Sequence, residues 1–370
     1  MLNTENLKTP VLLLDESRCR TNIRNMTLKA KRSGVVFRPH FKTHQSATIG
    51  EWFRDEGVHR ITVSSVRMAE YFSKAGWRDI TVAFPFNLRE TEDVNRVLSA
   101  GVHLNLLVDS AAAAKHLSKH LASETGIFIE IDTGDHRSGI HFEDIERLEQ
   151  TTEELQKAEK LVFKGFLTHD GHTYRAGNRG QIMEIHSTTV FRLRNLRNRY
   201  HPKKGNVMIS VGDTPACSLA DAFTGMDEVR PGNFVFYDLM QENLGVCNEH
   251  DIAVCLAVPV VSVDASNNRI VVYGGAVHLS KEALAYPRGQ KEYGRIVKLS
   301  EIGWSGSVKE AHLASLSQEH GIVNASQQLV RSLKPGDMIG ILPVHSCLTA
   351  DLSPCYLTLE NKRIDKMHLS

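Results

Sequence analysis

One lysine of this sequence stands in an unusual setting. Lys42 lies in the segment Arg-Pro-His-Phe-Lys-Thr-His (38–44), which directly follows the apolar stretch 34–37 and so comes near the end of an early strand. Positive charge nearby lowers the pKa of a lysine, and imine formation with an aldehyde needs the neutral amine. The segment makes Lys42 a candidate catalytic lysine. A surface lysine in a basic loop is the alternative interpretation of the same sequence.

A histidine and a cysteine two residues apart form a second candidate. His345 and Cys347 follow the apolar stretch 338–344. On an extended strand, residues two apart point to the same side, so the imidazole and the thiol would converge on one point. Neutral imidazole and thiolate suit zinc, whereas harder ions such as Mg²⁺ or Mn²⁺ prefer carboxylates. A buried histidine beside a buried cysteine gives the same pattern without a metal.

Two further polar groups follow apolar strands. His169 and His172, with Asp170 and Tyr174, come after the stretch 163–167, where they could bind a carboxylate, contact a metal or relay protons. Plain hydrogen-bonding histidines in a loop are the alternative. The segment 210–215 contains Ser210, Gly212 and Thr214 with free backbone N–H groups, which suits either a phosphate cradle or a simple turn.

The elements that must position these residues alternate in type over the first two-thirds of the chain. Short apolar runs predict buried strands at 11–14, 61–63, 80–83, 104–108, 127–131, 163–167 and 207–211. Helices are predicted at 18–32, 66–74, 91–99, 111–122, 142–160 and 180–198. The alternation predicts an α/β fold with a parallel sheet, and we favour a (β/α)8 TIM barrel because the unusual polar residues follow the strands. No GxGxxG follows the first strand, which argues against a dinucleotide-binding fold.

The pattern changes near residue 250. Strand-like runs at 252–263, 269–273, 328–330, 338–343 and 355–359 are separated by turn signals such as Asn267-Asn268 and Pro335-Gly336. We expect a barrel domain over 1–245, whose first ten residues pack on the other domain. A mostly-β C-terminal domain over 246–370 would carry His345 and Cys347.

Composition limits the class of protein. The 370 residues carry a formal net charge of +1, so no strong field recruits nucleic acid or an anionic membrane. No apolar run is long enough to span a bilayer, and the N-terminus lacks the layout of a signal peptide. The six cysteines form no CxxC pair, which favours a reduced compartment. These features predict a cytoplasmic protein.

Seven segments together carry a family resemblance. In order they are TPVLLLDESRCRTNIRNM (9–26), RPHFKTH (38–44), EIDTGDHRSGI (130–140), HDGHTY (169–174), SVGDTP (210–215), EVRPGNFVFYD (228–238) and PVHSC (343–347). They resemble the D-threonine aldolase and eukaryotic-type D-serine dehydratase family, which are fold-type III pyridoxal-phosphate (PLP) enzymes with an alanine-racemase-like barrel. The resemblance spans nearly the whole chain. It implies bound PLP, a C-terminal β domain, a divalent metal beside the cofactor and a homodimer.

The resemblance also assigns residues. It implies that Lys42 carries the Schiff base to PLP, that Arg137 neighbours the phenolic oxygen, and that Arg230 faces the pyridine nitrogen. Ser210, Gly212, Thr214 and Tyr237 would hold the phosphate, and Tyr174 is a further candidate cofactor contact. A guanidinium stays protonated, so Arg230 would keep the pyridine nitrogen unprotonated and weaken the ring as an electron sink. Bond breaking would then need help, which a metal could provide.

The residue at position 347 favours one reaction over another. In this resemblance the pair His345 and Cys347 fits the dehydratase branch, because the aldolase branch is expected to carry aspartate in place of the cysteine. We therefore expect a PLP- and Zn²⁺-dependent lyase, with Mn²⁺ or Mg²⁺ as other possible ions. Lys42 would act as general base. D-serine would give pyruvate and ammonia, and D-threo-3-hydroxyaspartate would give oxaloacetate and ammonia.

Three alternatives stay open. A metal-dependent D-threonine aldolase would use the same parts, with His169 or His172 as the base, and would release glycine and acetaldehyde. A non-catalytic PLP-binding protein is disfavoured because such single-barrel relatives lack a C-terminal β domain. An alanine racemase would need no metal.

Overall fold

The computed structural model of the chain describes residues 2–204 and 206–367. The chain forms two compact units. The first, here called the barrel unit, consists of Arg24–Lys42 and Gly50–Gly232. The second, the β unit, consists of Met1–Ile23, Thr43–Ile49 and Asn233–Ser370.

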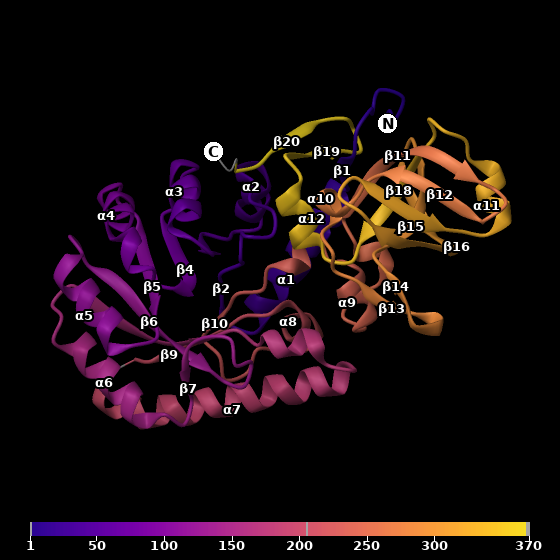
Figure 1. The fold of residues 1–370 in the computed structure, drawn as a ribbon. Coiled ribbons are helices and arrows are strands. Elements are labelled where there is room, and N and C mark those ends of the chain that lie inside the picture. Colours follow the sequence, from indigo (N-terminus) through magenta and orange to yellow (C-terminus); the bar gives the residue numbers. More distant parts are fainter. Residues whose placement is uncertain (1, 205, 368–370) are drawn as a thin grey trace. The chain divides into compact units, whose positions relative to one another are not determined.

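The barrel unit is built on parallel strands that nearly close into a ring (Figure 1). In spatial order these are β2 (Val36–Phe37), β10 (Glu228–Val229), β9 (Met208–Val211), β8 (Leu161–Thr168), β6 (Thr125–Asp132), β5 (His103–Val108), β4 (Asp79–Pro85) and β3 (Arg60–Val63). A parallel bridge between His40 and Thr62 joins the two ends of this order. The short strand β7 (Ile140–His141) pairs with β6. The predicted (β/α)8 barrel is confirmed.

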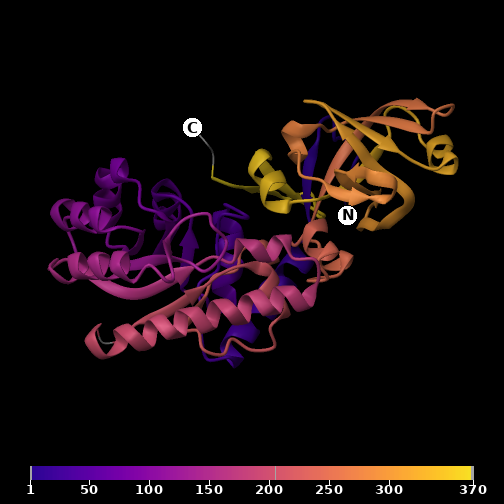
Figure 2. The same cartoon turned by 60° about the horizontal axis from the view of Figure 1, so that its bottom comes forward.

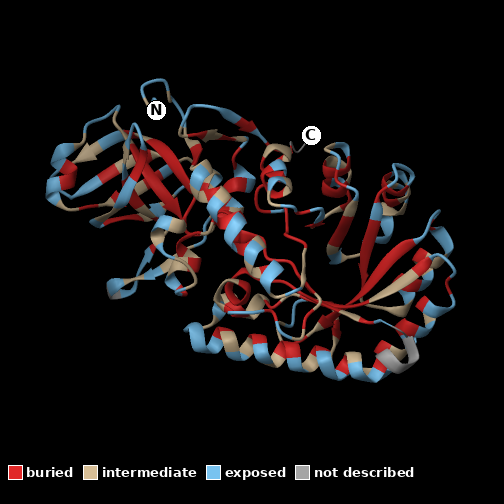
Figure 3. Ribbon diagram, turned by 180° about the vertical axis from the view of Figure 1, so that it is seen from behind, coloured by how far each residue is buried: buried red, intermediate tan, exposed pale blue. Residues whose placement is uncertain are grey.

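Helices cover the outside of these strands (Figures 1 and 2). They are α1 (Glu16–Arg32), α2 (Ala47–Asp55), α3 (Val66–Lys74), α4 (Thr91–Ser99), α5 (Ala111–His120), α6 (Ile145–Gln156), α7 (Arg179–Lys204) and α8 (Thr214–Leu219), with 3₁₀ turns at η1 (Leu88–Glu90) and η2 (Gly171–Arg175). Side chains of Ser65, Ser110, Asp144 and Asp213 cap four of them. Helix α7 buries one face, on which Ile182, His186, Thr189 and Leu193 recur every three or four residues (Figure 3).

A glycine in β8 lets two barrel strands approach each other. Gly165 has φ +142°, and a Cβ atom there would overlap the backbone of Met208 in β9. We expect Gly165→Ala to lower the free energy of unfolding by roughly 2–5 kcal/mol, because strain and overpacking add. The control is Gly57→Ala, which also has positive φ but no atom within 4 Å of the new Cβ, and should cost about 1–2 kcal/mol. Equal losses in urea denaturation would contradict the close approach.

The β unit contains one large sheet. Its strand order is β12 (Arg269–Tyr273), β17 (His320–Asn324), β16 (Gly303–Leu316), β15 (Gly294–Ser300), β18 (Met338–Pro343), β11 (Val254–Asp264), β1 (Val11–Leu14), β19 (Cys355–Thr358) and β20 (Arg363–Asp365), and β12 also pairs with β11. A hairpin joins β13 (Leu284–Tyr286) to β14 (Gln290–Glu292). The helices are α9 (Leu239–Asn243), α10 (Ala276–Leu279), α11 (Gln327–Ser332) and α12 (Ser346–Leu352), with 3₁₀ turns η3 (Asn233–Val235), η4 (Glu249–Asp251) and η5 (Pro287–Gly289). The predicted mostly-β C-terminal region is confirmed.

Three sequence-based interpretations are corrected here. The strand at 11–14 exists, but it pairs with β11 and β19 rather than with any barrel strand. The strand predicted at 328–330 is wrong, because Ser326 caps helix α11 there and accepts a hydrogen bond from the Leu329 N–H. His345 and Cys347 are not on a strand either. Strand β18 ends at Pro343, and His345 is the N-cap residue of α12.

Candidate active site

The ends of several barrel strands gather charged groups around Lys42. Lys42 follows β2 by five residues, its side chain is exposed, and its backbone N–H donates to His40 Nδ1 at 3.3 Å. The positive charges of Lys42, Arg137 and Arg230 all act on both His40 and His169. Residues that follow β2, β6, β8 and β10 thus face one region of the barrel unit, as strand ends in such barrels do.

The charge state of the segment around Lys42 differs from the expectation. Arg38 is buried and forms ion pairs with Glu228 and Asp79, both at 2.6 Å, so its charge is compensated. Burial lowers the pKa of His40 well below its usual range and that of His44 to about 3, which keeps both imidazoles neutral at pH 7. The uncompensated positive charge in this region therefore comes from Arg137 rather than from the residues next to Lys42.

Arg137 is exposed after β6. No residue in the described ranges forms an ion pair with its guanidinium. A guanidinium that carries no carboxylate partner remains able to bind an anionic oxygen.

Arg230 is buried and fully engaged. Its Nε donates to Ser210 Oγ at 2.7 Å, and its second amino group donates to the Thr168 carbonyl at 2.5 Å. Ser210 in turn donates to Glu228 at 2.7 Å. Burial lowers the pKa of Arg230 to about 10, with Glu228 opposing, so the side chain stays charged near neutrality. Gly212 permits this packing, because a Cβ there would lie 2.9 Å from the Cβ of Arg230.

His169 has a defined tautomer. Its Nδ1 lies within hydrogen-bond distance of the Gly212 carbonyl, which can only accept, so the proton resides on Nδ1 and Nε2 keeps a lone pair. Burial, followed by the charges of Lys42 and Arg137, lowers the pKa of His169 to about 3. His169 is therefore a neutral acceptor throughout the physiological pH range.

The structure separates the two predicted histidines. Charges that act on His172 belong to Asp135, Arg175, Asp132 and Arg192, and burial is the main cause that lowers its pKa. Tyr174, by contrast, lies near His169, with 6.2 Å between ring centroids, and its hydroxyl accepts the Thr214 N–H at 3.3 Å. Tyr174 and Thr214 thus adjoin His169, whereas His172 belongs to a different polar surrounding.

In the β unit, His345 and Cys347 do meet. The two side chains are hydrogen-bonded to each other. Burial lowers the pKa of His345, but Cys347, Asp238 and Glu282 outweigh it and raise that pKa to about 9. Burial raises the pKa of Cys347, but His345 and Thr43 bring it below the usual range. The pair therefore favours a thiolate beside an imidazolium near neutral pH. A zinc ion that binds the thiolate and the imidazole would displace the imidazolium proton.

Three residues that the sequence analysis did not single out orient this pair. Thr43 Oγ1 lies 3.3 Å and Asn233 Nδ2 lies 3.5 Å from Cys347 Sγ. Asp238 accepts from Asn233 at 2.6 Å and from the Ser346 N–H at 2.9 Å. All three stand within motifs quoted above, so a search for polar neighbours inside those motifs could have found them. Tyr237, proposed for phosphate binding, stands beside Asp238 with φ +49°.

These observations fit both groups that the resemblance implies. An exposed amine at Lys42 and an unpaired Arg137 suit an aldehyde cofactor with anionic oxygens. The hydrogen-bonded thiol and imidazole suit a divalent metal. All six cysteines lie within the described ranges and are free thiols. Among the helices described, none has the length and apolar character needed to cross a membrane.

The comparisons with known proteins agree over the whole chain. The model of the alanine racemase N-terminal domain matches residues 14–239, and the model named putative serine dehydratase domain matches residues 253–359. D-threo-3-hydroxyaspartate dehydratase from Delftia sp. is 30% identical over 95% of this chain and 94% of its own. D-serine dehydratase from Dictyostelium discoideum is 27% identical over 96% of this chain and 94% of its own.

Solved structures give the same picture. The Delftia dehydratase superposes with a TM-score of 0.91 at 27% identity and covers 100% of both chains. Two further solved structures of a D-threo-3-hydroxyaspartate dehydratase are alanine variants, one of a histidine and one of a cysteine two positions later, and the cysteine variant is in the metal-free form. D-threonine aldolase from Filomicrobium marinum has a TM-score of 0.79 at 18% identity, covers 98% of this chain and 95% of its own, and shares the fold. The chain thus belongs to the alanine-racemase-like, fold-type III family of PLP-dependent lyases that includes D-serine dehydratase and D-threo-3-hydroxyaspartate dehydratase.

Proposed function

We propose that this protein removes water from a small D-3-hydroxy amino acid and releases a 2-oxo acid and ammonia. D-serine and D-threo-3-hydroxyaspartate are the proposed substrates. The observation that carries the proposal is the hydrogen-bonded pair His345 and Cys347, with Thr43 3.3 Å from the sulfur. Thr43 is the residue that follows Lys42 in the chain, which supports a shared role of lysine and thiolate on one substrate.

Two bound groups would supply chemistry that side chains lack. PLP, held at Lys42, Arg137, Tyr174, Gly212, Thr214, Arg230 and Tyr237, supplies an electron-withdrawing ring to the substrate amine. A Zn²⁺ ion held by His345 and Cys347 supplies a Lewis acid for a hydroxyl, which is a poor leaving group. The two alanine variants of a D-threo-3-hydroxyaspartate dehydratase at positions two apart, one of them in the metal-free form, support assigning the ion to this pair.

Lys42 is the proposed general base. Its exposed Nζ would take the proton from the substrate Cα. Burial leaves its neighbours His40 and His169 neutral, so neither competes for that proton near pH 7. The protonated Nζ can then give this proton to the departing hydroxyl, so that water leaves, because no described histidine of this group has a pKa near neutrality.

Arg230, His169 and Arg137 would orient the reacting molecule. Arg230 is fixed by Ser210 and the Thr168 carbonyl and stays charged, so a ring nitrogen facing it remains unprotonated. We propose that Ser210 acts through Arg230 rather than by direct contact with phosphate, because its hydroxyl is engaged on both sides. His169 Nε2 is available to accept a hydrogen bond, and the exposed guanidinium of Arg137 is available for an anionic oxygen.

The histidines that could serve carbon–carbon cleavage are poorly suited to it, which favours elimination. Retro-aldol cleavage needs a base for the 3-hydroxyl proton, and His169, with a pKa of about 3, is a weak one. His172 has its own polar surroundings, apart from the charges of Lys42 and Arg230. We therefore keep D-threonine aldolase as the second candidate.

One assay separates the two reactions. The PLP- and Zn²⁺-loaded protein is incubated with D-serine, D-threo-3-hydroxyaspartate and D-threonine, and ammonia, 2-oxo acid, glycine and aldehyde are measured in each sample. We expect equal amounts of ammonia and 2-oxo acid, and no glycine. L-serine serves as the control substrate and should not react. Glycine and aldehyde without ammonia would identify the aldolase. In a further sample with D-alanine, formation of L-alanine would identify a racemase.

The family resemblance also underlies proposals for the oligomeric state and the cellular compartment. We propose that the chain works as a homodimer and in the cytoplasm. Analytical ultracentrifugation of the PLP-loaded protein at micromolar concentration should give twice the chain mass of 41.3 kDa. A single species of 41.3 kDa that retains full activity would rule out the dimer.

A further inference from the structure

Three buried side chains of the barrel unit converge on one point. Asp170 follows β8 by two residues, and Asp213 follows β9 by two residues. His186 lies on the buried face of α7. Their exposed fractions are 0%, 2% and 6%. One possible metal-binding atom from each residue lies within 4.8 Å of those of the other two.

In each carboxylate, one oxygen accepts hydrogen bonds and the other accepts none from the described residues. Asp170 Oδ1 accepts from Thr189 at 2.8 Å and from Thr133 at 3.2 Å. Asp213 Oδ2 accepts from Thr173 at 2.9 Å and from the Ala216 N–H at 2.8 Å. These four donors fix both carboxylate planes, so the other two oxygens are fixed as well.

The remaining atoms of the cluster have no donor. Asp170 Oδ2, Asp213 Oδ1 and His186 Nδ1 are buried, and none has a hydrogen-bond partner among residues 2–204 and 206–367. Buried polar atoms are paired in the large majority of cases, so three unpaired atoms within one cluster require an explanation. A bound group that accepts electron pairs from all three would satisfy them at once.

The charges of the cluster point to a cation. Two carboxylates this close and out of water cannot both be ionised unless a positive charge compensates them. Burial raises the pKa of Asp170 above its usual range and that of Asp213 to about 6. Arg230 acts on Asp213, but its guanidinium is already held by Ser210 and Thr168. Burial also lowers the pKa of His186, which leaves a lone pair on the imidazole.

We propose that Asp170, His186 and Asp213 bind a divalent cation at a second metal site, independent of His345 and Cys347. Two carboxylates and a neutral imidazole balance the charge of one divalent ion. Oxygen ligands suit Mn²⁺ and imidazole suits Zn²⁺, whereas the absence of thiolate from this set disfavours Cu⁺. The proposal does not depend on the reaction proposed above.

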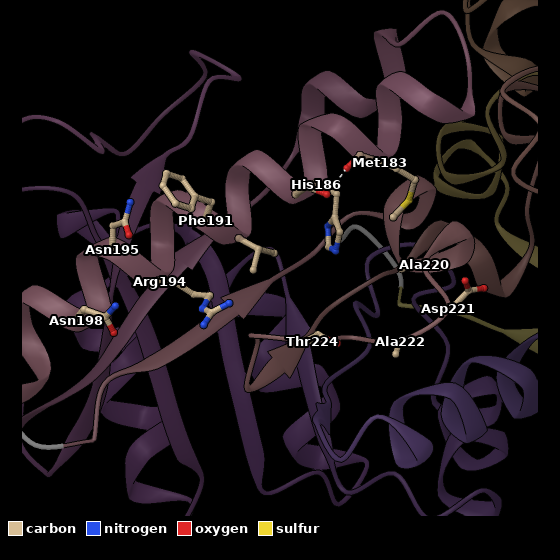
Figure 4. Close-up of a pocket in the computed structure, with 12 residues that line it drawn as sticks. Met183, His186, Phe191, Arg194, Asn195, Asn198, Ala220, Asp221, Ala222 and Thr224 are labelled. Carbon is tan, nitrogen blue, oxygen red and sulfur yellow. Dashed lines mark hydrogen bonds between the residues drawn. The ribbon is translucent and has the colours of Figure 1, made fainter.

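The surroundings of His186 suit entry and a positioning role. His186, Met183 and Arg194 of α7 line a pocket of about 660 Å³, to which Asp221 contributes from the segment after α8 (Figure 4). Because His186 lines this pocket, we propose the pocket as the route by which the ion enters. Asp170 follows His169 and Asp213 follows Gly212, the two residues joined by the His169 hydrogen bond. The ion would thus tie together the two loops that carry this bond.

The test counts ions per chain. Wild type, Cys347→Ala, His186→Gln and the double variant are stripped with chelator, reloaded with Mn²⁺ or Zn²⁺, desalted and measured by elemental mass spectrometry. We expect two ions in wild type, one in each single variant and none in the double variant. Asp221→Asn is the matched control, because Asp221 lines the same pocket outside the cluster, and it should keep both ions.

Affinity and stability give independent readouts. Titration of Cys347→Ala with Mn²⁺, followed by electron paramagnetic resonance, should give one site, and His186→Gln should weaken it by more than the roughly 10–100-fold that loss of an outer-shell partner costs. Mn²⁺ should raise the Tm of Cys347→Ala but not of the double variant. Asp170→Asn, which keeps an accepting oxygen for Thr133 and Thr189, provides a second ligand variant.

Two results would overturn the second site. One is equal ion content and equal Mn²⁺ affinity in Cys347→Ala with and without His186→Gln. The other is an infrared band of a protonated carboxyl group that persists in Mn²⁺-saturated protein and disappears in Asp170→Asn. That band would show that the two carboxylates share a proton instead of a metal ion.

Discussion

Replacing Lys42 by alanine should lower kcat for ammonia release by about 10³-fold or more, the larger part of what a positioned proton-transfer group contributes. Loss of the amine removes both the covalent anchor of the cofactor and the base for the substrate Cα proton. Lys42→Arg should fail equally, because a guanidinium stays protonated and cannot form an imine. Added methylamine should restore part of the activity of Lys42→Ala and should leave the activity of wild type unchanged.

The covalent anchor can be measured without turnover. Borohydride reduction of the PLP-loaded protein, followed by peptide mass spectrometry, should find the cofactor mass on the peptide that contains Lys42. Lys74→Ala is the control, because Lys74 is exposed on α3, outside the site, and pairs with Glu70 at 2.8 Å. Lys74→Ala should keep wild-type labelling and activity. Labelling at another lysine in wild type, or full activity in Lys42→Ala, would exclude the proposed role.

The sequence predicted the barrel because its strands and helices differ in hydrophobic period and alternate along the chain. It could not predict the partner of the strand at 11–14. A buried strand is apolar on both faces, so its side chains do not distinguish a parallel barrel from a mixed sheet. The strands β2 and β10 have only two residues each, which is too short for any period to be seen. Helix α12, which carries Cys347, was missed because it has only seven residues and only two residues separate it from the end of the apolar strand β18.

The sequence indicated candidate site residues but not their charge states. Lys42, His169, Arg137 and Arg230 are in the quoted motifs, and the charges of the lysine and the two arginines act on His169. We expected Arg38 and the two neighbouring histidines to supply the positive charge around Lys42, and that expectation was wrong. Arg38 pairs with Glu228, 190 residues away in sequence, and burial neutralises His40 and His44. A long-range carboxylate and the depth of an imidazole are properties of the fold, which no local spacing reveals.

Cys347→Ala should abolish ammonia release while leaving the cofactor attached at Lys42. The substitution removes one of two side chains proposed for the metal and leaves His345 without its hydrogen-bond partner. Loss of a Lewis acid for the hydroxyl costs several kcal/mol of transition-state stabilisation, which corresponds to roughly 10² or more in kcat. His345→Ala should act in the same way. Cys247→Ala and Cys355→Ala are the matched controls, because both cysteines are half-buried thiols outside the pair.

The two functions of the site can thus be separated. Borohydride labelling of Cys347→Ala should remain as in wild type, whereas elemental analysis should find one ion fewer per chain. A chelator should reproduce the loss in wild type, and Zn²⁺ should reverse it in wild type but not in Cys347→Ala. Cys347→Asp replaces the thiolate by a carboxylate and should shift the preference from Zn²⁺ toward Mn²⁺. If metal-free Cys347→Ala dehydrates D-serine at the wild-type rate, the thiolate has no part in removing the hydroxyl, and the elimination must depend on the barrel residues alone.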